Sequence, residues 1–84
     1  MQVKYPCLVQ LRSCKNLEKF AEKFGGKIVS VEKGGVDVYF EDVNDARRYI
    51  SRIKKFAKVR IKMSIKQPKI FFYSVRCLDE DRSR

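Results

Sequence analysis

The chain has 84 residues, and its 20 Lys and Arg against 10 Asp and Glu give it a formal net charge of +10. This length supports one small domain, expected over residues 1–78 with a charged tail at 79–84, and leaves little room for an enclosed active site. No apolar run reaches the length of a membrane span, and the absence of His excludes mechanisms that need a neutral imidazole.

The first half of the chain predicts a strand, a helix and a hairpin. Residues 3–11 alternate apolar and polar side chains, which predicts a half-buried strand. Apolar residues at helical spacing predict a helix over 16–24, which two glycines end. The β-branched and aromatic segments 27–32 and 36–40 predict two strands joined by a tight glycine-containing turn.

The second half predicts a longer helix and two more strands. A helix is predicted over 43–57, with acidic residues at its start and a basic outer side. Residues 59–66 alternate apolar and basic side chains, which predicts a strand with one face of each kind, and a further strand is predicted over 70–77. The predicted core comprises Leu17, Phe20, Phe24, Val38, Phe40, Ile50, Ile53, Ile61 and Met63.

The order of these elements predicts a fold of the α+β class. Strand, helix, strand, strand, helix and strand form the ferredoxin-like βαββαβ arrangement, to which the last strand is added. In that arrangement two helices cover one face of an antiparallel sheet, and the other face is left to solvent or to a ligand.

Part of the chain, from about Val3 to Ile65, resembles an RNA-recognition motif domain. Residues 16–25 are similar to the first helix of that family, which tends to end in Lys-Phe-Gly, and residues 40–46 to the junction between its third strand and second helix. The octamer Lys-Gly-Gly-Val-Asp-Val-Tyr-Phe at 33–40 matches the family's octamer at four positions, with Gly and Asp where the family carries its two base-stacking aromatic residues. The resemblance implies an RNA-binding domain with degenerate stacking motifs, or a degenerate member that contacts proteins.

The excess positive charge is confined to the second half of the chain. Residues 1–45 contain seven basic and seven acidic residues, whereas residues 46–78 contain eleven basic residues and no acidic one. This asymmetry favours a polyanionic partner, with a membrane surface as the second reading. Of these partners we expect RNA, with DNA as the alternative nucleic acid, and no membrane. The alternative is a basic surface that is merely solvated.

A hairpin between the last two strands adds aromatic residues to the predicted site. If residues 59–66 and 69–75 pair so that Ile65 lies opposite Ile70, two rings join the basic residues of the open sheet face, as a platform for single-stranded nucleic acid requires. The predicted site comprises Gln10, Arg12, Tyr39, Lys58, Arg60, Lys62, Lys66, Phe71 and Tyr73. The alternative is that the apolar run in residues 69–77 is buried against a protein partner or a second copy of the chain.

No catalytic, metal or cofactor site is predicted. Cys7, Cys14 and Cys77 lack the spacing of zinc ligands and are expected to be free thiols in a reducing cytoplasm. No nucleophile has an obvious base, and no glycine follows the first strand to let backbone amides hold a phosphate. The sequence therefore predicts a non-enzymatic RNA-binding protein of the ribonucleoprotein type, with a small protein-interaction, assembly or inhibitor module as the alternative.

Overall fold

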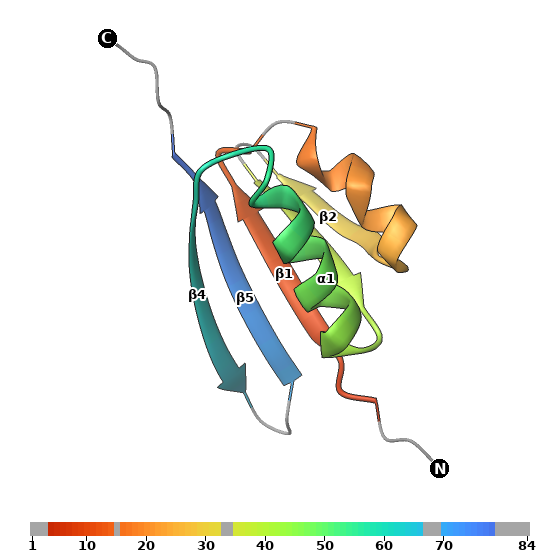
Figure 1. The fold of residues 1–84 in the computed structure, drawn as a ribbon. Coiled ribbons are helices and arrows are strands. Elements are labelled where there is room, and N and C mark those ends of the chain that lie inside the picture. The colour runs from red at the N-terminus through yellow and green to blue at the C-terminus, as the bar shows by residue number, and fades with distance from the viewer. Residues whose placement is uncertain (1–3, 15, 33–34, 67–69, 79–84) are drawn as a thin grey trace, which may run out of the picture.

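The computed structural model describes residues 4–14, 16–32, 35–66 and 70–78, apart from the side chain of Lys66. In this part of the chain, five strands form one sheet and two helices pack against the same face of it (Figure 1). We call this the covered face and the opposite one the open face. The elements are β1 (Cys7–Arg12), η1 (Leu17–Phe24), β2 (Lys27–Glu32), β3 (Gly35–Phe40), α1 (Val43–Ile53), β4 (Val59–Lys66) and β5 (Ile70–Cys77).

The order of the strands contradicts the predicted ferredoxin-like arrangement. The sheet has the order β2-β3-β1-β5-β4, and β1 pairs antiparallel with β3 but parallel with β5. The extra strand β5 is therefore inserted beside β1, and β4 is displaced to the edge. The composition of the two strands explains this exchange: β5 begins with four apolar residues and suits an interior position, whereas alternating basic residues suit β4 to an edge.

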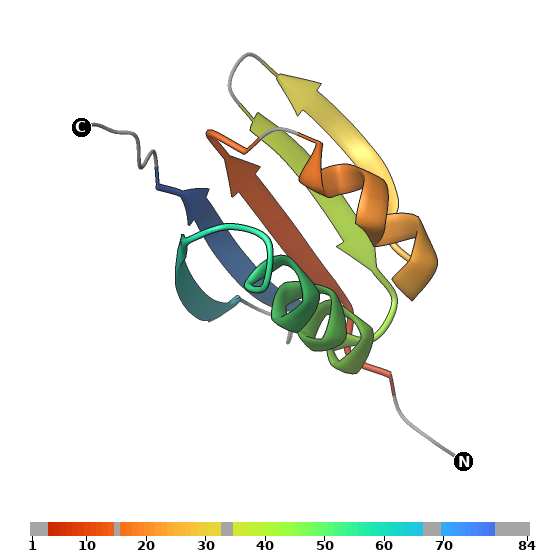
Figure 2. The same ribbon diagram turned by 45° about the horizontal axis from the view of Figure 1, so that its top comes forward.

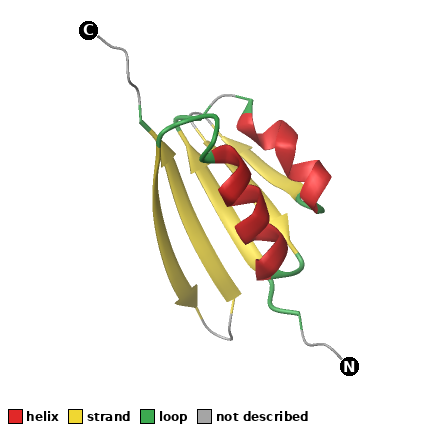
Figure 3. Ribbon diagram, viewed as in Figure 1, coloured by secondary structure: helices red, strands yellow, loops and turns green. Residues whose placement is uncertain are grey.

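The helices also differ from the prediction (Figure 3). The first is a 3₁₀ helix rather than an α-helix. The spacing of apolar residues did not distinguish the two kinds of helix, because residues three and four positions apart form an apolar side in both. The second helix ends at Ile53 instead of residue 57. After Ile53 the backbone forms a turn, in which the Phe56 amide donates a hydrogen bond to the Ile53 carbonyl. The Phe56 ring stacks on the Phe20 ring, with 5.0 Å between the centroids.

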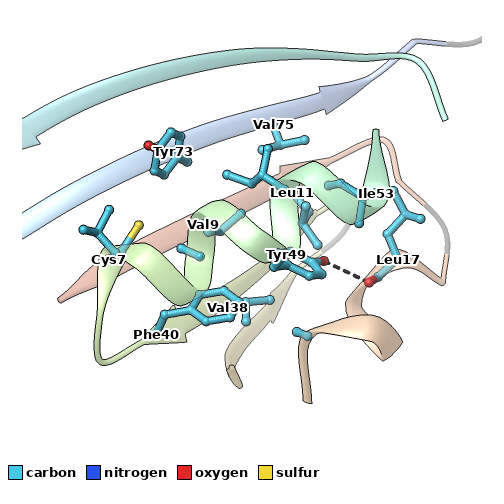
Figure 4. Close-up of a cluster of buried hydrophobic side chains, with 14 residues drawn as sticks. Cys7, Val9, Leu11, Leu17, Val38, Phe40, Tyr49, Ile53, Tyr73 and Val75 are labelled. Carbon is cyan, nitrogen blue, oxygen red and sulfur yellow. Dashed lines mark hydrogen bonds between the residues drawn. The ribbon is translucent and has the colours of Figure 1, made fainter. Parts of the chain in front are cut away.

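The core lies between the helices and the covered face (Figure 4). Leu17, Val38, Phe40, Ile50 and Ile53 are buried, as predicted, while Phe20, Phe24 and Ile61 are only partly buried against the core. The prediction is wrong for Met63, whose side chain is 48% exposed, because β4 lies at the edge of the sheet beyond the helices.

Tyr49 joins the two helices at the centre of this core. Its hydroxyl donates a hydrogen bond to the Leu17 carbonyl at 2.9 Å, and its ring lies 5.4 Å from the Phe40 ring. The residue is fully buried, and burial raises the pKa of its phenol above the usual value. Pairing of the hydroxyl with a carbonyl avoids the cost of an unsatisfied buried donor.

A disulfide between Cys14 and Cys77 contradicts the prediction of three free thiols. Cys14 follows β1 and Cys77 ends β5, and because these strands are parallel neighbours their ends meet, with the two Cα atoms 5.1 Å apart. Cys7 keeps a free, buried thiol. Disulfides are typical of oxidising environments, in contrast to the reducing compartment expected from the sequence.

Candidate nucleic-acid interface

The open face is the side of the sheet that neither helix contacts, and Figure 2 shows both helices on the other side. Successive residues of a strand point to opposite faces. Since Val9, Val38 and Val75 are buried beneath the helices, their strand neighbours point to the open face. Its side chains include Leu8, Gln10, Arg12, Asp37, Tyr39, Arg60, Lys62, Ser64, Phe72, Ser74 and Arg76.

One row of the open face is aromatic and apolar. In the register of the sheet, Leu8 of β1 pairs with Tyr39 of β3 on one side and with Phe72 of β5 on the other. All three residues are half-buried, so the rings of Tyr39 and Phe72 are partly accessible. Because neighbouring strands lie about 4.8 Å apart, the two rings are separated by about 10 Å across the sheet.

The next row is polar and borders a shallow depression. Gln10, Ser74 and Lys62 pair across β1, β5 and β4 in this row. A depression of about 470 Å³ lies here, lined by Gln10, Lys62, Met63, Ser64, Phe72 and Ser74. The depression thus combines one ring with amide, hydroxyl and ammonium groups, which donate and accept hydrogen bonds.

The Arg12 side chain lies across Gly35 and Asp37 of β3. A Cβ atom on Gly35 would lie 2.6 Å from Arg12 Nη1, so the glycine is what lets the arginine side chain lie across β3. Arg12 Nη1 donates to Asp37 Oδ1 at 3.2 Å and to the Leu11 carbonyl at 2.9 Å. An ion pair therefore occupies the two positions at which the octamer of the RNA-recognition motif carries rings.

Three other basic residues of the open face are exposed. Arg60 and Arg76 are cross-strand partners on β4 and β5, and Lys62 lies two residues further along β4. None of the three is within salt-bridge distance of a carboxylate in the part of the chain that the structure describes.

The predicted pairing of the last two strands is wrong by one residue. Ile65 lies opposite Phe71 instead of Ile70, so residues 67–69, which lie outside the described residues, separate the paired ends of the strands. A shift of one residue moves every side chain to the other face. Phe71 and Tyr73 consequently lie on the covered face, and Phe72 takes the open-face position that they were expected to share.

Phe71 and Tyr73 both have partners on the covered face. The Tyr73 hydroxyl accepts a hydrogen bond from Arg47 Nε at 3.1 Å, and the residue is buried. The Phe71 ring meets the Tyr5 ring edge to face at 6.1 Å between centroids. The apolar run at 70–73 offers a ring in either register, which is why the sequence did not indicate which ring would be open.

The remaining predicted residues lie at the ends of β4. Lys58 is exposed and precedes the strand, with its carbonyl accepting a hydrogen bond from the Leu78 amide at 2.9 Å. Lys66 ends the strand, and its side chain lies outside the described residues. The expected interface through residues 69–77 also changes position, because β5 has a strand on each side and presents no free edge.

The basic side chains on α1 are more engaged than those of the open face. Arg47 bonds to Tyr73, Arg48 pairs with Asp45 at 3.1 Å, and the Arg52 guanidinium lies 5.5 Å from the centroid of the Phe56 ring. The two basic surfaces thus carry similar charge but differ in the freedom of their side chains.

A larger cavity than the depression lined by Gln10 and Ser74 lies at the end of the sheet near the disulfide. It has a volume of about 1010 Å³ and is lined mainly by apolar side chains, with Glu32 and Arg76 as its charged residues. Within the described ranges, no group of three or more His, Cys, Asp or Glu residues is placed to hold a metal ion. No helix in these ranges is long and apolar enough to cross a bilayer.

No protein-family model, curated protein or solved structure matches the chain. Function is therefore inferred from the residues of the open face.

Proposed function

We propose that the protein binds single-stranded RNA on the open face and is not an enzyme. The observation that carries this proposal is the row Tyr39, Leu8 and Phe72, which puts two half-buried rings on the same face as the exposed basic side chains of β4. Rings interleaved with Lys and Arg side chains are the usual means of binding single strands, since every base has a face on which a ring stacks.

The rings and the cations have separate tasks in this proposal. Tyr39 and Phe72 each stack on an unpaired base, while Lys62, Arg60 and Arg76 bind phosphates along the side of the sheet formed by β4 and β5. Gln10 and Ser74, which lie between the rings and the cations, are placed to hydrogen-bond base edges or 2′-hydroxyls.

This arrangement favours single strands over duplexes. A stacked ring needs a base whose face is free, and in a duplex both faces are covered by neighbouring bases. Most of the remaining contacts are between cations and phosphates, so affinity falls as salt rises and sequence preference is weak.

The experiment that tests the proposal compares two double charge reversals. A labelled oligouridylate of about 12 nucleotides is titrated with the wild type, with the open-face variant R60E/K62E and with the helix variant R48E/R52E, and fluorescence anisotropy is measured. The total charge change is the same in both variants. We expect the open-face variant to lose affinity by at least about tenfold and the helix variant to lose much less. Greater loss in the helix variant would refute the proposal.

A second series of probes identifies the kind of nucleic acid. The same titration with single-stranded DNA and with duplex RNA should give weaker binding than single-stranded RNA, because DNA lacks the 2′-hydroxyl and the duplex hides its bases. Equal affinity for duplex and single strand would show that phosphates alone are bound and that the rings do not stack.

A further inference from the structure

Among the residues that the structure describes, the edge of the sheet formed by β4 is free. β4 is eight residues long, and within these residues it pairs with β5 alone, in a register without interruption. The Leu78 amide donates to the Lys58 carbonyl, so residues 58 and 78 form a hydrogen-bonded pair of this antiparallel ladder. Such pairs alternate along the ladder. The backbone groups of Arg60, Lys62 and Ser64 therefore point to β5, whereas those of Ile61, Met63 and Ile65 point outward.

Two of the three residues with outward backbone groups, Met63 and Ile65, also have exposed side chains. Ile61, Met63 and Ile65 share the covered face, yet Met63 is 48% and Ile65 57% exposed. Figure 1 shows β4 as the outermost strand, with α1 lying over β1 and not over this edge. Unpaired amides and carbonyls thus coincide with an apolar strip that lacks a cover.

The opposite edge, β2, is less suited to accept a further strand. Its register with β3 shifts between Ile28 and Ser30, which marks a bulge. Bulges twist an edge and interrupt the regular spacing of its free amides and carbonyls, and they are a common means of preventing edge-to-edge pairing. No such interruption occurs along β4.

The charge of β4 decides what kind of strand fits. Arg60 and Lys62 are exposed on its open-face side, and the chain has no acidic residue between positions 46 and 78. In antiparallel pairing with a second copy centred on Met63, Arg60 would lie opposite Lys66 of the other copy. Like charges directly opposite each other destabilise a sheet. The edge therefore disfavours a second copy and is complementary to an acidic strand.

We propose that the free edge of β4 binds an extended segment of a partner protein in which apolar and acidic residues alternate. The segment extends the sheet by main-chain hydrogen bonds to Ile61, Met63 and Ile65, and its apolar residues lie opposite these three on the covered face. Its acidic residues lie opposite Arg60 and Lys62, in non-hydrogen-bonded pairs, where Cα atoms approach to about 4.5 Å and side chains are close.

The position of backbone N–H groups in the bound segment provides a sharp test. The probes are two capped peptides of alternating Glu and Val, of equal composition and with equal numbers of N-methyl groups. In one peptide the Glu amides are methylated, which leaves the amides facing β4 intact and prevents self-association beyond a dimer. In the other the Val amides are methylated, which removes the hydrogen bonds to β4. Affinity is measured by anisotropy of the labelled peptides with the wild-type protein.

We expect the peptide methylated at Glu to bind at least about tenfold more tightly than the peptide methylated at Val. Equal affinity of the two peptides would show attraction by charge alone and overturn the proposal, as would absence of binding by both. A stable dimer of the protein alone that the variant Met63→Lys dissociates would show that a second copy occupies the edge instead, and would also overturn it.

A charge exchange tests the acidic character of the partner. The variant Lys62→Glu should lose affinity for the peptide methylated at Glu and gain affinity for the same peptide with Lys in place of Glu, whereas the control Lys55→Glu, in the turn after α1, should change neither by more than about twofold. Preference for the Lys peptide by the wild type would contradict the assignment. RNA affinity, measured separately on the wild type, does not depend on either peptide result.

Discussion

Arg47 Nε donates a hydrogen bond to the hydroxyl oxygen of Tyr73 at 3.1 Å, which joins α1 to the covered face of β5. This bond raises the pKa of Arg47 above its usual range. Because adjacent residues of a strand point to opposite faces, a strand that holds Tyr73 under α1 must present Phe72 on the open face. The ring that the proposed RNA site needs is thus positioned by the packing of the helix on the other side of the sheet.

The first prediction concerns Tyr73 itself. The sequence suggested that its ring stacks on a base, but the structure buries it, so Tyr73→Ala should lower the free energy of unfolding by about 3 kcal/mol through the cavity that it leaves. Urea denaturation measures this loss. Tyr73→Phe, which keeps the ring and removes the hydroxyl, should be less destabilising. RNA affinity of either folded variant should stay within about twofold of the wild type. A large loss of affinity in Tyr73→Phe would contradict the assignment of this residue to the core.

The second prediction concerns the disulfide. Cys14 and Cys77 are 63 residues apart in the sequence, and a cross-link that closes a loop of this size stabilises a protein by about 4 kcal/mol in the chain-entropy model. We therefore expect Cys14→Ser and Cys77→Ser to lower the free energy of unfolding by similar amounts, and the double variant to be no worse than either. A reductant should reproduce the loss in the wild type. Unchanged stability of the wild type under reducing conditions would show that the bond does not form.

The third prediction concerns the pH dependence that Cys7 contributes. Burial raises the pKa of the Cys7 thiol from its ordinary value of 9.0 to about 12. The folded state therefore holds this proton more tightly than the unfolded state. Its contribution to stability is complete below pH 9 and is lost as the pH rises towards the folded-state value.

Comparison with a variant isolates this contribution from the other alkaline groups, including Tyr49, whose pKa burial also raises. We expect the stability of the wild type minus that of Cys7→Ala to stay constant below about pH 8.5 and to decrease between about pH 9 and about pH 10.5, as measured by urea denaturation. Iodoacetamide should not modify Cys7 in the folded protein near neutral pH, because the thiolate is the reactive form. Rapid modification there would contradict the burial of the thiol.

The sequence predicted the local elements of this fold better than their arrangement. Alternation and apolar spacing located every strand and both helical segments, because these patterns depend on neighbouring residues. Phe40 and Ile53 are buried as the same patterns predicted. The insertion of β5 between β1 and β4 was missed. It depends on whether β1 pairs more favourably with β5 or with β4, and both strands are far from β1 in the sequence, so no local pattern indicates the choice.

The candidate site was predicted in part, for a related reason. The alternation of side chains along a strand correctly predicted that Arg60, Lys62 and Tyr39 lie on the open face. Their role in binding is still a prediction. The rings of Phe71 and Tyr73 were assigned to the wrong face because a register shift of one residue reverses all the side chains of a strand. The disulfide was missed because Cys14 and Cys77 meet only through the parallel pairing of β1 with β5.

The affinity of single-stranded RNA for two adjacent phenylalanine variants tests the central claim most directly. Phe71 and Phe72 are both half-buried and follow each other in β5, but they lie on opposite faces. We predict that Phe72→Ala weakens binding of an oligouridylate by about 1–3 kcal/mol, the value of one base stacked on a ring. Phe71→Ala should lower stability and leave the affinity of the folded protein nearly unchanged. Equal affinities for the two variants, or a greater loss in Phe71→Ala, would contradict RNA binding on the open face.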